Sequence, residues 1–244
     1  MTPGDALAIT AAGFAAGGVN TIVGSGSLVT FPTLLALGYP AVAANCSNTV
    51  GLVFGGVSGV VGYRRELAGQ RRRALTLACG TAAGALLGGA LLLILPPGVF
   101  DAVVPALILL ACGLMAIRRT PDIHTDHERT VAGVGASFGT GIYGGYFGAA
   151  QGIILMSLLR FCFTDDLQRL NALKNVLAAT ANGVAALLFV FVAPVRWGPA
   201  ALIALGSVAG AQVAARYGRR IPSEVLRWIV VIGGTIVAVV LIVT

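Results

Sequence analysis

Gly24-Ser25-Gly26-Ser27 and Gly148-Ala149-Ala150-Gln151-Gly152 each interrupt apolar sequence, one in each half of the chain. An apolar run follows each break, Leu28–Leu37 after the first and Ile153–Phe163 after the second. At 1.5 Å per residue these runs reach roughly 15 Å, about half of the ~30 Å hydrocarbon core of a bilayer. Because broken backbone at membrane depth must be packed in protein or line a cavity, the two breaks predict short re-entrant helices of the kind found in transporters.

The composition is that of a membrane protein. Of 244 residues, 57% are hydrophobic and 10% are charged, whereas a soluble domain carries about 25% charged residues. Since an open sheet cannot cross lipid, the expected fold class is an all-α polytopic (multi-pass) membrane protein. Ten apolar segments are expected to be helical: Ala6–Val23, Leu28–Leu37, Ala41–Tyr63, Ala74–Leu95, Val99–Ile117, Val131–Phe147, Ile153–Phe163, Leu167–Val192, Pro199–Tyr217 and Val225–Val243.

The arginines predict how the chain is oriented in the membrane. They concentrate after the third, fifth and ninth segments, at residues 64–73, 118–129 and 216–227. Since basic loops stay in the cytoplasm, these loops are expected inside and both termini outside. This clustering accounts for the net charge of +7. The expected partner is therefore the lipid bilayer and not nucleic acid.

The two halves share a pattern of small and polar residues. Its members are Gly17, Gly24, Asn48 and Gly56 in the first half and Gly141, Gly148, Asn175 and Gly183 in the second. The orientation inserts the halves in opposite directions, so the pattern predicts inverted repeats about a pseudo-two-fold axis in the membrane plane. The expected divisions are a first repeat at residues 1–95, a connecting helix and cytoplasmic loop at 96–130, a second repeat at 131–217 and a C-terminal helix at 218–244.

The breaks themselves are candidates for binding an anion. If each is the tip of a hairpin, the following short helix begins near the middle of the membrane. A helix N-terminus presents free N–H groups and about half a positive charge, so two of them facing one region can hold an anion. The candidate residues are Gly24, Ser25, Gly26, Ser27, Gln151 and Gly152. The alternative is that the glycines only permit close helix crossings.

Polar turns lie on the two helices that follow the short ones. The first turn is Asn45-Cys46-Ser47-Asn48, and the second contains Asn171, Lys174 and Asn175. The three residues of the second turn are spaced i, i+3 and i+4, which places them on one face of a helix. The Cys46 thiol could donate a hydrogen bond to a sulfur oxyanion, or it could be a small apolar filler.

Lys174 is the only lysine in the chain. A cation inside the membrane costs roughly 2.5–3.5 kcal/mol on insertion scales, and no carboxylate stands three or four residues away. An anionic substrate would be a natural partner for it. The alternative is that the four-carbon side chain snorkels to the cytoplasmic surface.

The sequence disfavours other kinds of site. The apolar segments are expected to contain no Asp, Glu or His, which disfavours a carboxylate proton relay, a cation site and an intramembrane enzyme. The acidic and histidine-containing loop at residues 122–128 is interpreted as a solvated loop. No metal and no cofactor are therefore expected.

In its glycine and polar motifs the chain resembles the sulfite exporter TauE/SafE family, also called the toluene sulfonate uptake permease family. The motifs are Gly13, Gly17-Gly18, Gly24 to Leu28, Pro32, Ala43-Ala44-Asn45 and Ser47 in the first half, and Gly141, Gly148, Gly152, Arg169 to Asn175 and Trp197 in the second. Ser25, Ser27, Ala149 and Ala150 depart from the family pattern.

The resemblance implies a permease of the prokaryotic inner membrane, with inverted repeats and no cofactor. Its implied substrates are small sulfur-containing or organic anions such as sulfite, thiosulfate or sulfonates. We therefore expect a secondary transporter that works by alternating access. A non-transporting membrane scaffold and a proton- or cation-coupled carrier of an organic acid stay open as alternatives, as does a homo-oligomer.

Overall fold

The computed structural model describes residues 1–116, 129–217, 232 and 235, and these ranges contain helices and no strands. The expected all-α class is therefore confirmed. Each described helix lies over one of the predicted segments, whereas Val225–Val243, apart from residues 232 and 235, and the loop at 122–128 fall outside the described residues. The helices are α1 (Pro3–Ile22), α2 (Ser27–Ala36), α3 (Ala41–Gly62), α4 (Arg71–Ile94), α5 (Pro97–Ala116), α6 (Thr130–Tyr146), α7 (Gln151–Cys162), α8 (Leu167–Val192) and α9 (Trp197–Tyr217).

Both predicted breaks interrupt the helices. Between α1 and α2 the backbone of Gly24 turns through a φ of +89°, and between α6 and α7 Gly148 has a φ of +74°. Glycine adopts such angles without a steric penalty. Ala150 is also left-handed, with a φ of +58°, which costs an L-residue roughly 1–2 kcal/mol. The second break is therefore held in shape by its surroundings.

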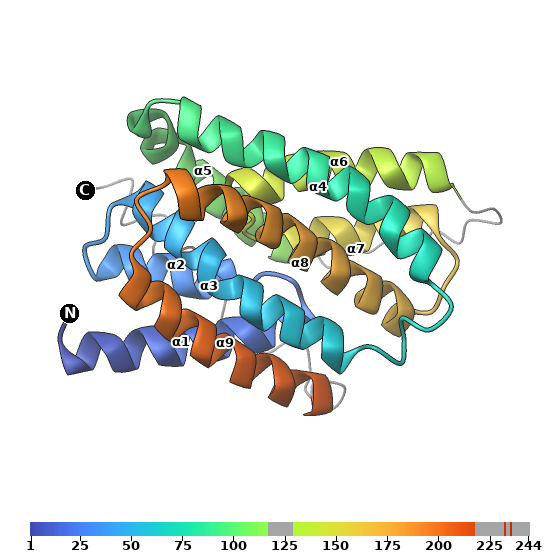
Figure 1. The fold of residues 1–244 in the computed structure, drawn as a ribbon, viewed down its shortest axis with the longest axis horizontal. Helices are drawn as coiled ribbons and strands as arrows, with labels where there is room; N and C mark the ends of the chain where they lie inside the picture. The colour runs from blue at the N-terminus through green and yellow to red at the C-terminus, as the bar shows by residue number, and fades with distance from the viewer. Residues whose placement is uncertain (117–128, 218–231, 233–234, 236–244) are drawn as a thin grey trace.

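The helices pack in matching pairs. In Figure 1, α4 and α6 run together along one edge of the molecule and α1 and α9 along the opposite edge, with α3 and α8 between them. Small residues make both edge pairs close: Gly17 of α1 lies against the backbone of Ser207, and Gly141 of α6 lies against the backbone of Thr81. Small residues permit such close approach between helices in lipid.

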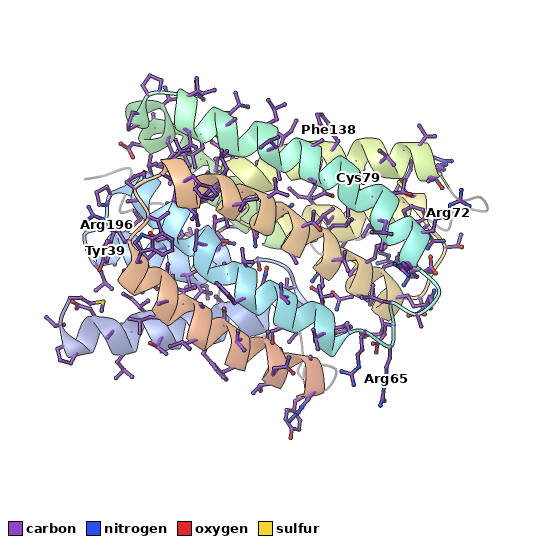
Figure 2. The ribbon with its side chains drawn as sticks, viewed as in Figure 1. Tyr39, Arg65, Arg72, Cys79, Phe138 and Arg196 are labelled. Carbon is purple, nitrogen blue, oxygen red and sulfur yellow. The ribbon has the colours of Figure 1, made fainter. Side chains whose placement is uncertain are left out.

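The lengths and surfaces of the helices suit a bilayer. Three described helices are long and apolar enough to cross it, namely α4, α8 and α9, and shorter apolar helices cover Ser27–Ala36, Pro97–Gly113 and Gln151–Cys162. Large apolar side chains are exposed around the molecule, among them Leu7, Phe54, Leu187, Phe191 and Leu205. Figure 2 shows such side chains projecting from the outer helices. This apolar exterior fits a lipid environment.

An aromatic cluster joins the middle of α2 to the start of α5 and the end of α6. The ring of Phe31 meets the ring of Phe147 edge-on, with centroids 5.2 Å apart, and that of Phe100 at 6.4 Å. Phe100 also meets Tyr146 at 5.6 Å. Edge-to-face pairs at these distances are favourable. Because Phe147 directly precedes the second break, the cluster anchors that break against α2 and α5.

Candidate functional site

The two glycine breaks touch each other. The backbone N–H of Gly152 donates a hydrogen bond of 2.9 Å to the carbonyl of Gly24. The backbones approach so closely that a Cβ on either glycine would overlap the Cα of the other. Segments far apart in the sequence therefore meet at one buried point.

In this conformation most backbone N–H groups at the starts of both short helices already donate hydrogen bonds to backbone carbonyls. In α7, Gln151 donates to Gly148 at 3.3 Å, and Ile153 donates to Ala150 at 3.0 Å. In α2, the N–H groups of Leu28 and Val29 donate to Ser25 and Gly26 at 3.1 and 2.9 Å. An anion could therefore reach the N–H of Gly152 only after Gly24 and Gly152 separate.

The polar turn of α8 caps the end of α1. The Lys174 ammonium donates to the carbonyls of Asn20 at 3.2 Å and Thr21 at 3.4 Å. The side-chain amides of Asn171 and Asn175 donate to the same Thr21 carbonyl at 3.4 and 3.3 Å. We call this arrangement the α1 cap. Since the C-terminus of a helix carries a partial negative charge, the end of α1 offsets part of the charge of Lys174.

Lys174 does not reach the surface of the protein. Its exposed fraction is 0%, and it is among the largest fully buried side chains. The snorkelling alternative is therefore wrong for this conformation. Two hydrogen bonds to carbonyls leave one of the three ammonium N–H groups available.

The polar turn of α3 caps the end of α6 in the second half of the chain, as the polar turn of α8 caps the end of α1. The Asn45 side-chain amide donates to the carbonyl of Tyr146, the last residue of α6, at 3.0 Å. We call this contact the α6 cap. Each polar turn thus caps the long helix that leads into the glycine break of the opposite half.

Asn48, the other asparagine of the α3 turn, bonds to its own half. Its amide donates to the hydroxyl of Ser27 at 3.1 Å, and its carbonyl oxygen accepts from the hydroxyl of Thr30. Three buried polar atoms around the breaks have no hydrogen-bond partner among the described residues: Ser25 Oγ, Asn45 Oδ1 and Asn171 Oδ1. Buried polar atoms are rarely left unpaired, so this region has spare capacity for a polar ligand or water.

Other predicted residues point elsewhere. Ser47 donates to the carbonyl of Ala43 at 2.6 Å and accepts the N–H of Arg196 at 2.8 Å, so it faces the turn before α9. Gln151 packs on Gly144 and donates to the carbonyl of Thr140 at 3.2 Å, back onto α6. Cys46 is fully buried within the main hydrophobic cluster. The structure therefore brings Gly24, Ser25, Ser27, Asn45, Asn48, Gly152, Asn171, Lys174 and Asn175 around the breaks, with Gly26 packed on α1 beside them.

Several groups at the site were not predicted from the sequence. Thr30 bonds to Asn48, and the Tyr143 hydroxyl donates to the carbonyl of Ala149 at 2.6 Å inside the second break. The position of Thr30 three residues after Ser27 could have revealed it, because i and i+3 share one helix face. The carbonyls of Asn20 and Thr21 carry no such sequence signal.

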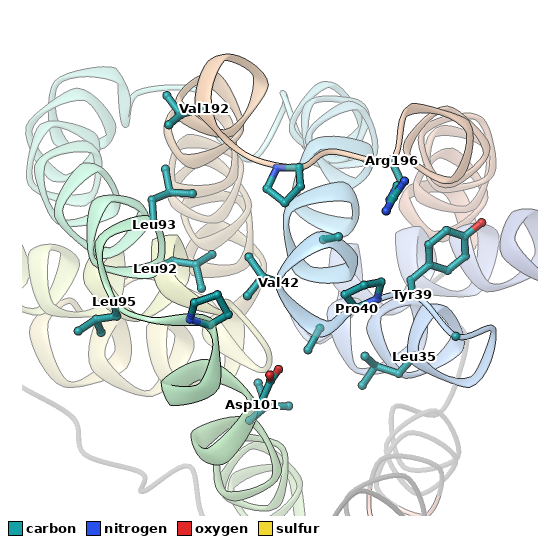
Figure 3. Close-up of a pocket in the computed structure, with 16 residues that line it drawn as sticks. Leu35, Tyr39, Pro40, Val42, Leu92, Leu93, Leu95, Asp101, Val192 and Arg196 are labelled. Carbon is teal, nitrogen blue, oxygen red and sulfur yellow. The ribbon is translucent and has the colours of Figure 1, made fainter.

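A cavity of about 810 Å³ opens at the end of the molecule that holds the Pro97 and Pro194 turns. Figure 3 shows Arg196 on one side of it and Asp101 on another, with Val42 toward the middle and Leu92 on the side away from Arg196. Asp101, near the start of α5, lies within the predicted segment Val99–Ile117, so the expectation that the apolar segments contain no acid is wrong at this position. Ala43 also lines the cavity, and the N–H of Arg196 bonds to Ser47. The cavity therefore ends beside the polar turn of α3.

A second cavity of about 520 Å³ lies among the starts of α4, α6 and α8. Neither of these two cavities is lined by residues of the breaks. Within the described ranges, no group of three or more His, Cys, Asp or Glu side chains could hold a metal ion.

Comparison with known proteins gives one family. The model of the family described as sulfite exporter TauE/SafE matches residues 9–241. A probable membrane transporter protein ORF9 from Sinorhizobium sp. is 29% identical over 224 residues, covering 91% of this chain and 86% of that protein. A probable membrane transporter protein from Haemophilus influenzae is 28% identical, with 87% and 85% covered. The probable membrane transporter protein YfcA from Escherichia coli K12 is 27% identical, with 82% and 76% covered. No solved structure matches the chain.

Proposed function

The chain belongs to the sulfite exporter TauE/SafE family of membrane transporters, and we propose that it carries small anions across the prokaryotic inner membrane by alternating access. The family description names sulfite, and the resemblance of the motifs extends the proposed substrate class to related sulfur oxyanions and sulfonates. The proposed orientation places the arginine-rich loops in the cytoplasm and the termini outside.

The fully buried lysine is the observation that carries this proposal. Lys174 has an exposed fraction of 0%, and among the described residues its ammonium donates long hydrogen bonds to two carbonyls of α1. A buried cation is costly without a strong partner. An anion bound between Lys174 and the separated N–H of Gly152 would supply that partner, and the unpaired hydroxyl of Ser25 would be a further donor to it. The site we propose is therefore the contact between the two breaks.

The two caps support a mechanism of alternating access. The α1 cap joins α8 to α1, and the α6 cap joins α3 to α6. The same relation in both halves supports the inverted repeats at residues 1–95 and 131–217. We propose that one cap and the Gly24–Gly152 bond loosen when the site opens toward one side of the membrane, and that the other cap loosens when it opens toward the other side.

The cavity beside the α3 turn suits access from the external side. Its volume of about 810 Å³ lies within the usual 300–1,000 Å³ range of small-molecule pockets. Arg196 at its rim attracts anions, and Val42, Leu92 and Val192 give it an apolar wall. Such a lining accommodates an anion that carries an organic group as well as a bare oxyanion.

Flux into proteoliposomes tests the proposal. Purified protein is reconstituted, and uptake of labelled sulfite, thiosulfate, sulfate and an aromatic sulfonate is measured. We expect saturable uptake of at least one of them, lost in Lys174→Ala and kept in Arg65→Gln, an exposed arginine far from the site. Folded protein that moves none of the anions but co-purifies with another protein would favour a scaffold. Uptake that depends on sodium or on a pH gradient would favour a coupled carrier.

A further inference from the structure

The cavity among the starts of α4, α6 and α8 lies at the opposite end of the molecule from Arg196. Figure 2 shows Arg72 and Arg65 at one end and Arg196 and Tyr39 at the other. The cavity has a volume of about 520 Å³ and is lined by Gln70, Arg72, Arg73, Thr76, Thr130 and Arg169. It shares no lining residue with the cavity near Arg196 or with the breaks.

The lining is strongly positive. Three arginines surround the cavity, and Asp165 forms ion pairs with Arg73 and with Arg169, the latter at 3.1 Å. The residues that line the cavity include these three arginines and no acidic residue, so the lining itself is positive. The N-termini of α4 and α6 add partial positive charge to the cavity, because no side chain caps either of them. Such a site attracts anions.

The buried side-chain amide of Gln70 sets a second requirement for a ligand of this cavity, in addition to negative charge. Gln70 has an exposed fraction of 3%, and its Nε2 donates to the carbonyls of Glu66 at 2.8 Å and Arg169 at 3.3 Å. These two bonds fix which end of the amide faces the carbonyls. Its Oε1 is buried and has no hydrogen-bond partner among the described residues. Since a carbonyl oxygen only accepts, a ligand that completes this site must donate a hydrogen bond.

We propose that this cavity binds a phosphate group that carries its own hydrogen-bond donor. The arginines bind the phosphate oxygens, and a hydroxyl or ammonium of the ligand donates to Gln70 Oε1. Two sources share this chemistry: the headgroup of an anionic lipid with free hydroxyls, and inorganic phosphate, which keeps an O–H at neutral pH. Sulfate has a similar size and charge but no such donor. The requirement for a donor therefore separates phosphate from sulfate.

The surroundings of the cavity suit a lipid. Leu75 and Val131 are 58% and 88% exposed, and each directly adjoins a residue that lines the cavity. The acyl chains of a lipid could cover these side chains while the headgroup occupies the cavity. Basic pockets between helices at the cytoplasmic side of a membrane are suited to anionic headgroups.

Two binding measurements on the full chain in detergent distinguish the sources. Native mass spectrometry compares retention of phosphatidylglycerol, which has a phosphate and free hydroxyls, with phosphatidylcholine, which has no donor. Thermal stability is measured with millimolar inorganic phosphate and, separately, sulfate. The test variant is Arg72→Gln, because Arg72 lines the cavity and is exposed enough for its loss to leave folding intact. Arg71→Gln is the matched control, an adjacent exposed arginine that does not line the cavity.

Each result decides for or against the proposal. Preferential retention of phosphatidylglycerol that falls about tenfold in Arg72→Gln and not in Arg71→Gln supports a lipid ligand. Stabilisation by phosphate but not by sulfate, lost only in Arg72→Gln, supports the free anion. The proposal is overturned if neither probe binds the wild type, if sulfate equals phosphate and phosphatidylcholine equals phosphatidylglycerol, or if both variants behave alike. The comparison of Arg72→Gln with Arg71→Gln separates these outcomes from anion binding at the proposed transport site, because neither arginine lies at the breaks.

Discussion

Gly152 and Gly24 are joined by a backbone hydrogen bond of 2.9 Å, although they stand in opposite halves of the chain. The bond ties the start of α7 to the turn between α1 and α2. Neither residue has room for a Cβ. This contact closes the centre of the molecule, and its opening is the step that we propose exposes the anion site.

Substitution of either glycine by alanine tests how much the contact matters. Gly24→Ala and Gly152→Ala should each lower the free energy of unfolding by roughly 1–3 kcal/mol, because the added Cβ overlaps the opposite backbone. Thermal unfolding in detergent measures the loss, and anion uptake should fall with it. The matched control is Gly183→Ala on α8, where a Cβ meets no atom within 4 Å. A destabilisation as large in Gly183→Ala would contradict this explanation.

The caps should act as separate contacts. Asn45→Ala removes the α6 cap and Asn171→Ala removes one donor from the α1 cap. Each should cost about 0.5–1 kcal/mol of unfolding free energy, the usual size of such bonds between membrane helices. The double variant should lose the sum, because the two bonds share no partner. Asn182→Ala, a half-buried asparagine further along α8, serves as the control. Strong coupling between the two caps would argue against two independent contacts.

Arg196 should assist substrate capture and not the transport step itself. Arg196→Gln should raise the KM for the transported anion several-fold and leave the maximal rate unchanged, since the charge lies at the rim of the cavity. The difference should shrink at high salt. The backbone bond to Ser47 survives this substitution. Asp101→Asn removes the negative charge of the same cavity and should lower the KM. Equal KM values in all three proteins would rule out a recruiting role.

Asp165 should make the protein less stable in acid. Burial alone would raise its pKa, but hydrogen bonds from Arg169 and Arg73 and their positive charges outweigh burial, so the pKa lies below its usual value. A lowered carboxyl pKa stabilises the fold above the unfolded value, and this contribution is lost as the pH falls through the folded pKa. Asp165→Asn should therefore reduce stability at neutral pH and flatten its decline below about pH 4.

The neighbouring carboxylate provides the control for that measurement. Asp166 caps α8 by accepting from the N–H groups of Gln168 and Arg169. Asparagine caps a helix about as well as aspartate, so Asp166→Asn should change stability at neutral pH much less. Both variants remove one negative charge. If their acid unfolding profiles coincide, net charge and not the ion pairs of Asp165 explains the dependence.

The sequence predicted much of the helical framework because apolar length and glycine breaks are local signals. Gly24 and Gly148 have positive φ angles at the predicted interruptions. The spacing of Asn171, Lys174 and Asn175 placed them on one face, and their side chains converge on one turn of α1. Periodicity alone is sufficient for such conclusions.

The hydrogen-bond partners of the site residues could not be predicted, because they depend on contacts between residues far apart in the sequence. The partners of Lys174 are backbone carbonyls of Asn20 and Thr21, and carbonyls are present at every residue, so no motif marks them. Gln151 was expected to serve the anion, but its side chain folds back onto Thr140 because the glycine at 144 leaves space there. The partner that each of these polar side chains bonds to is decided by tertiary packing and not by the local sequence pattern.

Equilibrium binding of the transported anion to purified Lys174→Met is the most direct test of the central claim. The variant keeps the length of the side chain and removes its charge, and its melting temperature shows whether the fold is retained. We expect the wild type to bind one anion per chain and the folded variant to bind at least tenfold more weakly, because a buried charge-assisted contact is lost. Wild-type affinity in folded Lys174→Met would show that the anion is held somewhere other than between Lys174 and the paired breaks.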